Sequence, residues 1–115
     1  MADSLELAGK LDAMLGIEAE IYQVTLYSTT DAIIATTTAS GATHFNVIAS
    51  TAQLKNTVAA IDFTIASGDV GLTASYVLIQ NVAGETLIRV DLESTIPLTT
   101  AGTATMAIGD LTADL

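Results

Sequence analysis

The stretch from Ser75 to Leu115, SYVLIQNVAGETLIRVDLESTIPLTTAGTATMAIGDLTADL, decides the fold class of this chain. Short runs of β-branched and other apolar residues alternate in it with residues that favour turns. In chain order they predict a strand at Tyr76–Gln80, a tight turn at Asn81–Glu85, a returning strand at Thr86–Leu92, a Pro-containing connection at Ser94–Leu98 and a Gly-interrupted strand at Thr99–Ile108. The stretch therefore predicts antiparallel sheet.

Runs of the same kind occur upstream of this stretch. They predict four more strands, at Ile21–Tyr27, Ile33–Thr38, Phe45–Ala49 and Asn56–Ala66, and they predict Ile61, Phe63 and Ile65 on one face with Asp62, Thr64 and Ala66 on the other. The segment between the last two, Ala49–Leu54, fits either a loop or an extra helical turn. Strands that recur about every ten residues, with turns between them, are typical of a sandwich or barrel. We therefore expect an all-β fold, an antiparallel β-sandwich of Ig-like or jelly-roll-like type with one short N-terminal helix.

The helix is expected at about residues 4–15. Asp3-Ser4-Leu5-Glu6 resembles a capping box, and Gly16 suits a left-handed C-cap. Four apolar residues recur at helical spacing: Leu7, Leu11, Met14 and Leu15. This stripe needs a partner, which is either the chain's own sheet or a neighbouring subunit. We expect a single domain, with the helix and an arm at 1–20 and the sandwich at 21–115.

The composition indicates a protein that associates with other subunits. Hydrophobic residues make up 50% of the chain but aromatic residues only 4%, and the mean hydropathy is +0.56. No run approaches the roughly 20 apolar residues of a spanning helix, so we expect no membrane partner. Large exposed apolar patches usually mark contacts with partners. We therefore expect part of the apolar surface to be covered by other copies or by another protein.

The net charge of −10, from 13 acidic and 3 basic residues, narrows the class of partner. Binding to nucleic acid requires clustered Lys and Arg, so we expect no nucleic-acid partner. The charge suits docking on a basic protein surface. The chain has no cysteine, which excludes disulfides and thiolate sites. Residues 1–10 lack a basic segment followed by an apolar one, so we expect no secretory signal and folding in the cytoplasm.

Few residues in this chain suggest chemistry. His44 is the only histidine, and its neighbours offer no relay to a nucleophile. Asp91 and Glu93 lie two residues apart on a predicted strand, so both carboxylates are expected on one side, as a solvated face partly neutralised by Arg89. A weak cation site at this pair stays open. We expect no catalytic residues, no metal site and no cofactor.

Three stretches carry a family resemblance: LAGKLDAMLG (Leu7–Gly16), VTLYST (Val24–Thr29) and the run from Ser75 onward. Their order is similar to that in a group of small virion proteins of tailed bacteriophages, described as tail-fibre-like or head-decoration proteins. The group pairs an N-terminal helix with a compact β-sandwich whose hairpin turn reads Asp/Asn-x-Ala-Gly and whose last strand ends near Gly-Asp-Leu. Asn81–Glu85 and Gly109–Thr112 match these two features. The resemblance implies no catalytic residues.

The leading hypothesis is a capsid decoration or cement subunit. Such a subunit would bind the major capsid protein on the outer surface of the virion, as a homotrimer, after assembly in the host cytoplasm. The alternatives are a tail or tail-fibre adaptor component and a small hydrolase that uses Asp91, Glu93 and His44. Six apolar residues are candidates for the interface with partners: Leu7, Leu11, Met14, Leu15, Ile96 and Leu98.

Overall fold

The computed structural model describes residues 2–114, and side chains from Glu6 onward. Antiparallel strands dominate it, and one long helix precedes them, as the sequence predicts for an all-β protein. The helices are α1 (Ala2–Glu20), α2 (Gly41–His44) and the 3-10 turn η1 (Ser67–Asp69). The strands are β1 (Gln23–Ser28), β2 (Ile33–Thr38), β3 (Asn46–Ile48), β4 (Gln53–Lys55), β5 (Ile61–Ile65), β6 (Thr73–Gln80), β7 (Thr86–Pro97), β8 (Gly102–Met106) and β9 (Thr112–Ala113).

The largest sheet has four antiparallel strands in the order β2-β1-β6-β7. Its inner face carries Val24 and Leu26 of β1 and Val77 and Ile79 of β6, all of them buried. Side chains alternate between the two faces of a strand, so the residues adjacent to these, such as Tyr76, lie on the outer face. β7 forms one edge of this sheet because only β6 pairs with it in the described chain.

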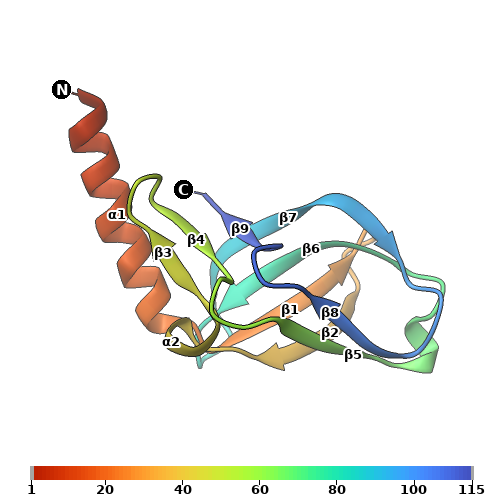
Figure 1. Cartoon of the computed structure of the whole chain (residues 1–115). Coiled ribbons are helices and arrows are strands. Elements are labelled where there is room, and N and C mark those ends of the chain that lie inside the picture. Colours follow the sequence, from red (N-terminus) through yellow and green to blue (C-terminus); the bar gives the residue numbers. More distant parts are fainter. Residues whose placement is uncertain (1, 115) are drawn as a thin grey trace.

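A two-stranded sheet of β5 and β8 covers the inner face of the large sheet (Figure 1). Ile61, Phe63 and Ile65 of β5 are buried while Asp62 and Thr64 are exposed, which confirms the alternation predicted for this strand. The buried side chains of both sheets form one apolar core. Burying each large aliphatic or aromatic side chain contributes about 1.5–3 kcal/mol, so this core is the main source of stability.

A third sheet, in the order β3-β4-β9, lies at the other end of the molecule, next to α1 (Figure 1). Met14 of α1, Leu54 of β4 and Ala113 of β9 extend the core into this region. The N-terminal turns of α1 extend past the turn that joins β3 to β4 (Figure 1). The molecule is therefore elongated, with extents of 51 × 25 × 23 Å.

The helix is longer than predicted at both ends. It begins at Ala2, ahead of the expected capping box, and it ends at Glu20 instead of residue 15. The side chain of Asp3, the expected first residue of that box, lies outside the described side chains. Gly16 is therefore an interior residue and not a C-cap. A glycine inside a helix costs about 1 kcal/mol relative to alanine, which the burial of Ile17 and Ile21 beyond it offsets.

Two predicted strands in the middle of the chain are shorter than expected. Residues 41–44 form α2, whose N-cap is Ser40, and the Phe45 amide donates to the Gly41 carbonyl, so β3 begins only at Asn46. β5 begins at Ile61, because Asn56 makes buried hydrogen bonds to residues 107–111 instead of joining the strand. The ambiguous segment Ala49–Leu54 forms the β3–β4 turn and the beginning of β4.

The C-terminal strands also differ from the prediction. The expected connection at Ser94–Leu98 is mostly strand, since β7 continues to Pro97, which lies at the end of an edge strand, where proline is tolerated. The next strand covers only Gly102–Met106, and the short strand β9 follows it. Tyr76–Gln80 and Thr86–Leu92 do form a hairpin, and Ile33–Thr38 is confirmed as a strand.

Candidate functional site

β7 and β8 are consecutive antiparallel strands, yet no ladder joins them in the part of the chain that the structure describes. The segment that connects β7 to β8 is instead hydrogen-bonded to the residues that precede β6. The Leu98 amide donates to the Leu72 carbonyl (2.9 Å) and the Gly71 amide donates to the Leu98 carbonyl (2.8 Å). These bonds fix the end of β7 against the beginning of β6. β8 instead pairs with β5, and the two consecutive strands diverge.

Three adjoining cavities follow this divergence, with volumes of 510, 220 and 100 Å³. The first two share Leu92, Glu93 and Asp110, and the last two share Ile96, Thr105 and Met106. We call the whole depression the β7–β8 trough. Its walls are residues 90–96 of β7 and 104–106 of β8, with the segment 109–112 at its wide end.

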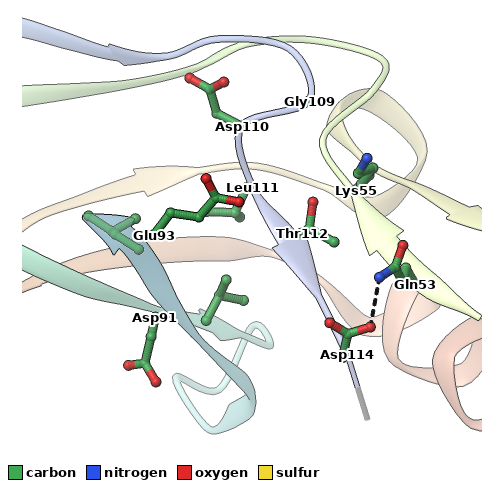
Figure 2. A pocket seen from close by; sticks show the side chains of 11 residues that line it. Gln53, Lys55, Asp91, Glu93, Gly109, Asp110, Leu111, Thr112 and Asp114 are labelled. Carbon is green, nitrogen blue, oxygen red and sulfur yellow. Dashed lines mark hydrogen bonds between the residues drawn. The ribbon is translucent and has the colours of Figure 1, made fainter. Parts of the chain in front are cut away.

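The wide end of the trough is acidic (Figure 2). Four acidic residues line it, Asp91, Glu93, Asp110 and Asp114, and Lys55 is the single basic residue among the lining residues. Asp114 accepts a hydrogen bond from the Gln53 side chain (2.9 Å), and Asp110 accepts one from the Ala107 amide (3.2 Å).

The structure describes the side chains of residues 6–114. Among them, no three Asp, Glu or His side chains approach closely enough to hold a metal ion. With four acidic residues and one basic residue, the wide end is a region of negative potential.

The narrow end of the trough is apolar. Its 100 Å³ cavity reaches between the two sheets to the core residues Leu26 and Phe63. Ile96, which is 49% exposed, and Met106 form its entrance from the middle of the trough. This space matches one aliphatic side chain of modest size and has little to offer a polar ligand.

Asn56 holds the wall of the acidic end in place. Its side chain is fully buried, donates to the Ala107 carbonyl (3.0 Å) and accepts from the Leu111 amide (2.9 Å). The Asn56 carbonyl also accepts from the Gly109 amide (3.1 Å). One residue thus ties the segment from Ala107 to Leu111 to the end of β4 and positions Asp110 at the trough.

An aromatic and charged cluster on the outer face of the large sheet positions Asp91. The rings of Tyr27 and Tyr76 stack with their centroids 5.0 Å apart, and the Arg89 guanidinium lies 3.8 Å from the Tyr76 centroid. Arg89 donates to Asp91 (2.9 Å), and the Tyr76 hydroxyl donates to Asp31 (2.9 Å). Desolvation of the ring, the hydrogen bond to Asp31 and the negative charge of Asp31 raise the pKa of Tyr76.

The residues considered for a hydrolase are not brought together. Asp91 and Glu93 both line the trough, but Figure 2 shows them pointing in different directions and not to one side as expected. The alternation is broken because residues 92–95 bulge between the pairs Tyr76↔Asp91 and Ala74↔Ile96. His44 lies in α2, where its Nδ1 bonds to the Thr43 hydroxyl (2.8 Å), and it does not line the trough.

The candidate interface residues fall into two groups. Leu15 and Ile96 are 46% and 49% exposed, and Leu7 and Leu11 are partly covered, so a partner can contact all four. Met14 and Leu98 are instead buried in the chain's own core, at 0% and 7% exposure. Those two predictions mistook core residues for surface residues, since an apolar residue at helical or strand spacing has the same signature in either place.

The sequence reasoning placed Asp110 only in an acidic C-terminus and not at a cavity, and it missed Asn56 and the free edge of β8. A weak signal for the first was the Ile108-Gly109-Asp110 turn, in which Gly109 takes a positive φ of 89°. No local signal marked Asn56, because its partners lie about fifty residues away in the sequence.

No helix in the described residues is long and apolar enough to cross a membrane. No protein-family model matches the chain, and neither the curated proteins nor the solved structures compared with it give a match. The trough and the uncovered apolar side chains are therefore the observations from which function is inferred.

Proposed function

We propose that this protein is a structural, non-enzymatic subunit of a virion that binds the outer surface of a capsid and stabilises it. In this proposal the two sheets that enclose the core are the layers of an antiparallel β-sandwich, and α1 is a docking element. The family resemblance of Leu7–Gly16, Val24–Thr29 and the C-terminal run supports the proposal. The partners are the major capsid protein and further copies of this chain.

The observation that carries the proposal is the incompletely covered apolar side of α1. Met14 at the middle of the helix is fully buried against the domain, whereas Leu15 is 46% exposed and Leu7 and Leu11 are only partly covered. The N-terminal turns of the helix extend past the nearest hairpin (Figure 1). A projecting helix gains most of its stability from packing, so a neighbouring subunit is the natural cover for this face.

Stabilisation of a shell requires only that the subunit binds the assembled lattice more tightly than its loose components. A homotrimer would present three copies of the same contact at once, and weak contacts then combine into strong binding. The net charge of −10 favours this arrangement on a basic lattice face. The same charge disfavours direct contact with the packaged nucleic acid.

Purified protein added to capsids that lack it tests the proposal. The expected result is a higher temperature of capsid disruption, measured by the release of packaged nucleic acid. Leu15→Glu is expected to reduce the effect, because it places a charge on the uncovered side of α1. Ala13→Glu, which adds the same charge at another exposed position of α1, is expected to retain it. No rise with the unaltered protein would exclude the decoration role.

Location on the particle provides a second test. Antibody labelling of intact virions should mark the head, at a copy number in the hundreds if the subunit follows the capsid lattice. Signal confined to the tail would reject decoration in favour of a tail or tail-fibre adaptor.

A further inference from the structure

The β7–β8 trough follows the edges of two strands and not their faces. Successive side chains on a strand point to opposite faces, so a cavity lined from one face is lined by every second residue. The trough instead contacts three successive residues of β8, Ala104 to Met106, and three of β7, Leu92 to Ser94. A depression of this kind exposes backbone groups as well as side chains.

The two edges differ in their suitability for pairing. β7 bulges at residues 92–95, and bulges twist a strand away from regular pairing. β8 pairs in unbroken register with β5 over all five of its residues, Gly102 to Met106. No backbone hydrogen bond joins its other edge to a further described segment. β8 therefore offers a regular, unoccupied edge on which one more strand can form.

The trough also specifies the side chains of an added strand. Residues that point inward at its narrow end meet the apolar cavity behind Ile96 and Met106. Residues at its wide end meet Glu93 and Asp110, and Glu93 has no hydrogen-bond partner among the described side chains. An aliphatic anchor and a basic end complement these two regions.

A second copy of this chain is a poor occupant because it has only 3 basic residues, which lie far apart in the sequence and already have acidic neighbours. Lys10 pairs with Glu6 (3.4 Å) and Arg89 pairs with Asp91 (2.9 Å), while Lys55 already lines the trough. These are all 3 basic residues of a chain with a net charge of −10. The charge complementarity favours a different, basic protein.

We propose that the β7–β8 trough binds an extended basic segment of a partner protein, which pairs with the free edge of β8 as an added strand. An aliphatic side chain of the segment enters the cavity behind Ile96, and its Lys or Arg residues face Glu93 and Asp110. Main-chain pairing supplies affinity and the two ends of the trough supply specificity. The inference rests on the proposed function in taking this segment to be an arm of the capsid protein.

Binding of synthetic peptides to the purified protein tests the trough directly. The probe is a fluorescent peptide of about eight residues, the length of an ordinary strand, in which valine and lysine alternate. A valine–glutamate peptide and a serine–lysine peptide are the comparisons. Fluorescence anisotropy at physiological salt is expected to show binding of the valine–lysine peptide at least tenfold tighter than that of either comparison. Equal binding of the serine–lysine peptide would reduce the site to nonspecific charge attraction and overturn the proposal.

Variants locate the binding. Glu93→Lys combined with Asp110→Lys is expected to weaken it at least tenfold, and Ile96→Ser is expected to weaken it about fivefold through the lost apolar contact. The matched control combines Asp12→Lys with Glu20→Lys, the same change of charge on the exposed surface of α1. Circular dichroism confirms that each variant is folded. Equal weakening by the control would overturn the assignment to the trough.

Amide hydrogen exchange separates strand addition from other modes of binding. The peptide is expected to slow exchange at those amides of Gly102–Met106 that β5 does not hold, and to leave the amides of β2 unchanged. Unchanged exchange in β8 would overturn the pairing.

The capsid assay distinguishes this inference from the proposed function. If the Glu93/Asp110 variant stabilises capsids as well as the unaltered protein does, the trough is not the contact, although decoration stands. If peptides bind in the trough but the protein stabilises no capsid, the decoration role is excluded and the assignment of the trough as a peptide-binding site is retained.

Discussion

At the scale of single residues, Asn56 is the most consequential polar side chain in the core. It is fully buried, and its amide satisfies one backbone carbonyl and one backbone amide of the 107–111 segment. Alanine would leave the buried Leu111 amide and the partly buried Ala107 carbonyl without this partner, and an unsatisfied buried group costs about 1–3 kcal/mol. We expect Asn56→Ala to lower the free energy of unfolding by about 2–4 kcal/mol in urea titrations.

Asn46→Ala is the matched control, because Asn46 is exposed on β3 and its loss should change stability by less than about 0.5 kcal/mol. Asn56→Asp is expected to be as harmful as alanine, since a buried carboxylate accepts from Leu111 but faces the Ala107 carbonyl. A stable, unaltered Asn56→Ala protein would show that the segment is held by other contacts.

Tyr76 gives the protein a predictable response to alkaline pH. Desolvation and the contact with Asp31 raise its pKa above the ordinary value of 10.0. A group whose folded pKa is raised adds stability below its unfolded pKa, and that stability is lost as the pH rises through the folded pKa. We therefore expect the free energy of unfolding to decrease above about pH 10 in the unaltered protein and to decrease less in Tyr76→Phe.

Tyr22→Phe serves as the control for this measurement. Tyr22 is 44% exposed and its hydroxyl makes no hydrogen bond within residues 6–114, so loss of this hydroxyl should change the free energy of unfolding by less than about 0.5 kcal/mol. Parallel curves for Tyr76→Phe and the unaltered protein would contradict the role assigned to the Asp31 contact.

At the scale of elements, the contact between α1 and α2 depends on Gly41. A Cβ at this position would overlap the Glu18 carbonyl near the end of α1. Because backbone atoms cannot move aside cheaply, α1 would have to shift from its place against the domain. We expect Gly41→Ala to destabilise the protein by about 1–3 kcal/mol, measured by thermal unfolding.

Gly68→Ala is the control for Gly41. Gly68 has open space where a Cβ would lie and no positive φ, so its substitution should be close to neutral. Equal stability of the two variants would mean that α1 is not held firmly at α2, and would weaken the case for α1 as a rigid docking element.

At the scale of the whole molecule, apolar surface and net charge oppose each other in self-association. The uncovered side of α1 favours contact between copies, while the charge of −10 repels them at low salt. We expect sedimentation velocity to show mostly monomer at low ionic strength and a larger species, a trimer in the proposed function, as salt screens the charge. Leu15→Glu should remain monomeric at all salt concentrations tested, and a monomer under every condition would exclude self-association.

The sequence predicted the fold class because strand signals are local. Alternation in Ile61–Ile65 and the turn residues of Asn81–Glu85 depend only on the pleat and on turn geometry, and both were confirmed. The end of α1 was mispredicted because Gly16 is a local signal for termination, whereas Ile17 and Ile21 keep the helix going through contacts with the core. Asn56 carried no local signal of its role, because its hydrogen-bond partners lie about fifty residues away in the sequence.

The sequence by itself therefore determined an acidic, cysteine-free, mainly antiparallel β protein with apolar surface to cover. Only the tertiary structure decided which strand edges remain free and which apolar residues lie on the surface. Leu98 bonds to the Gly71–Leu72 segment and separates β7 from β8, and Asn56 brings Asp110 to the space between them. These outcomes depend on contacts between residues far apart in the chain, which the period of a local pattern does not encode.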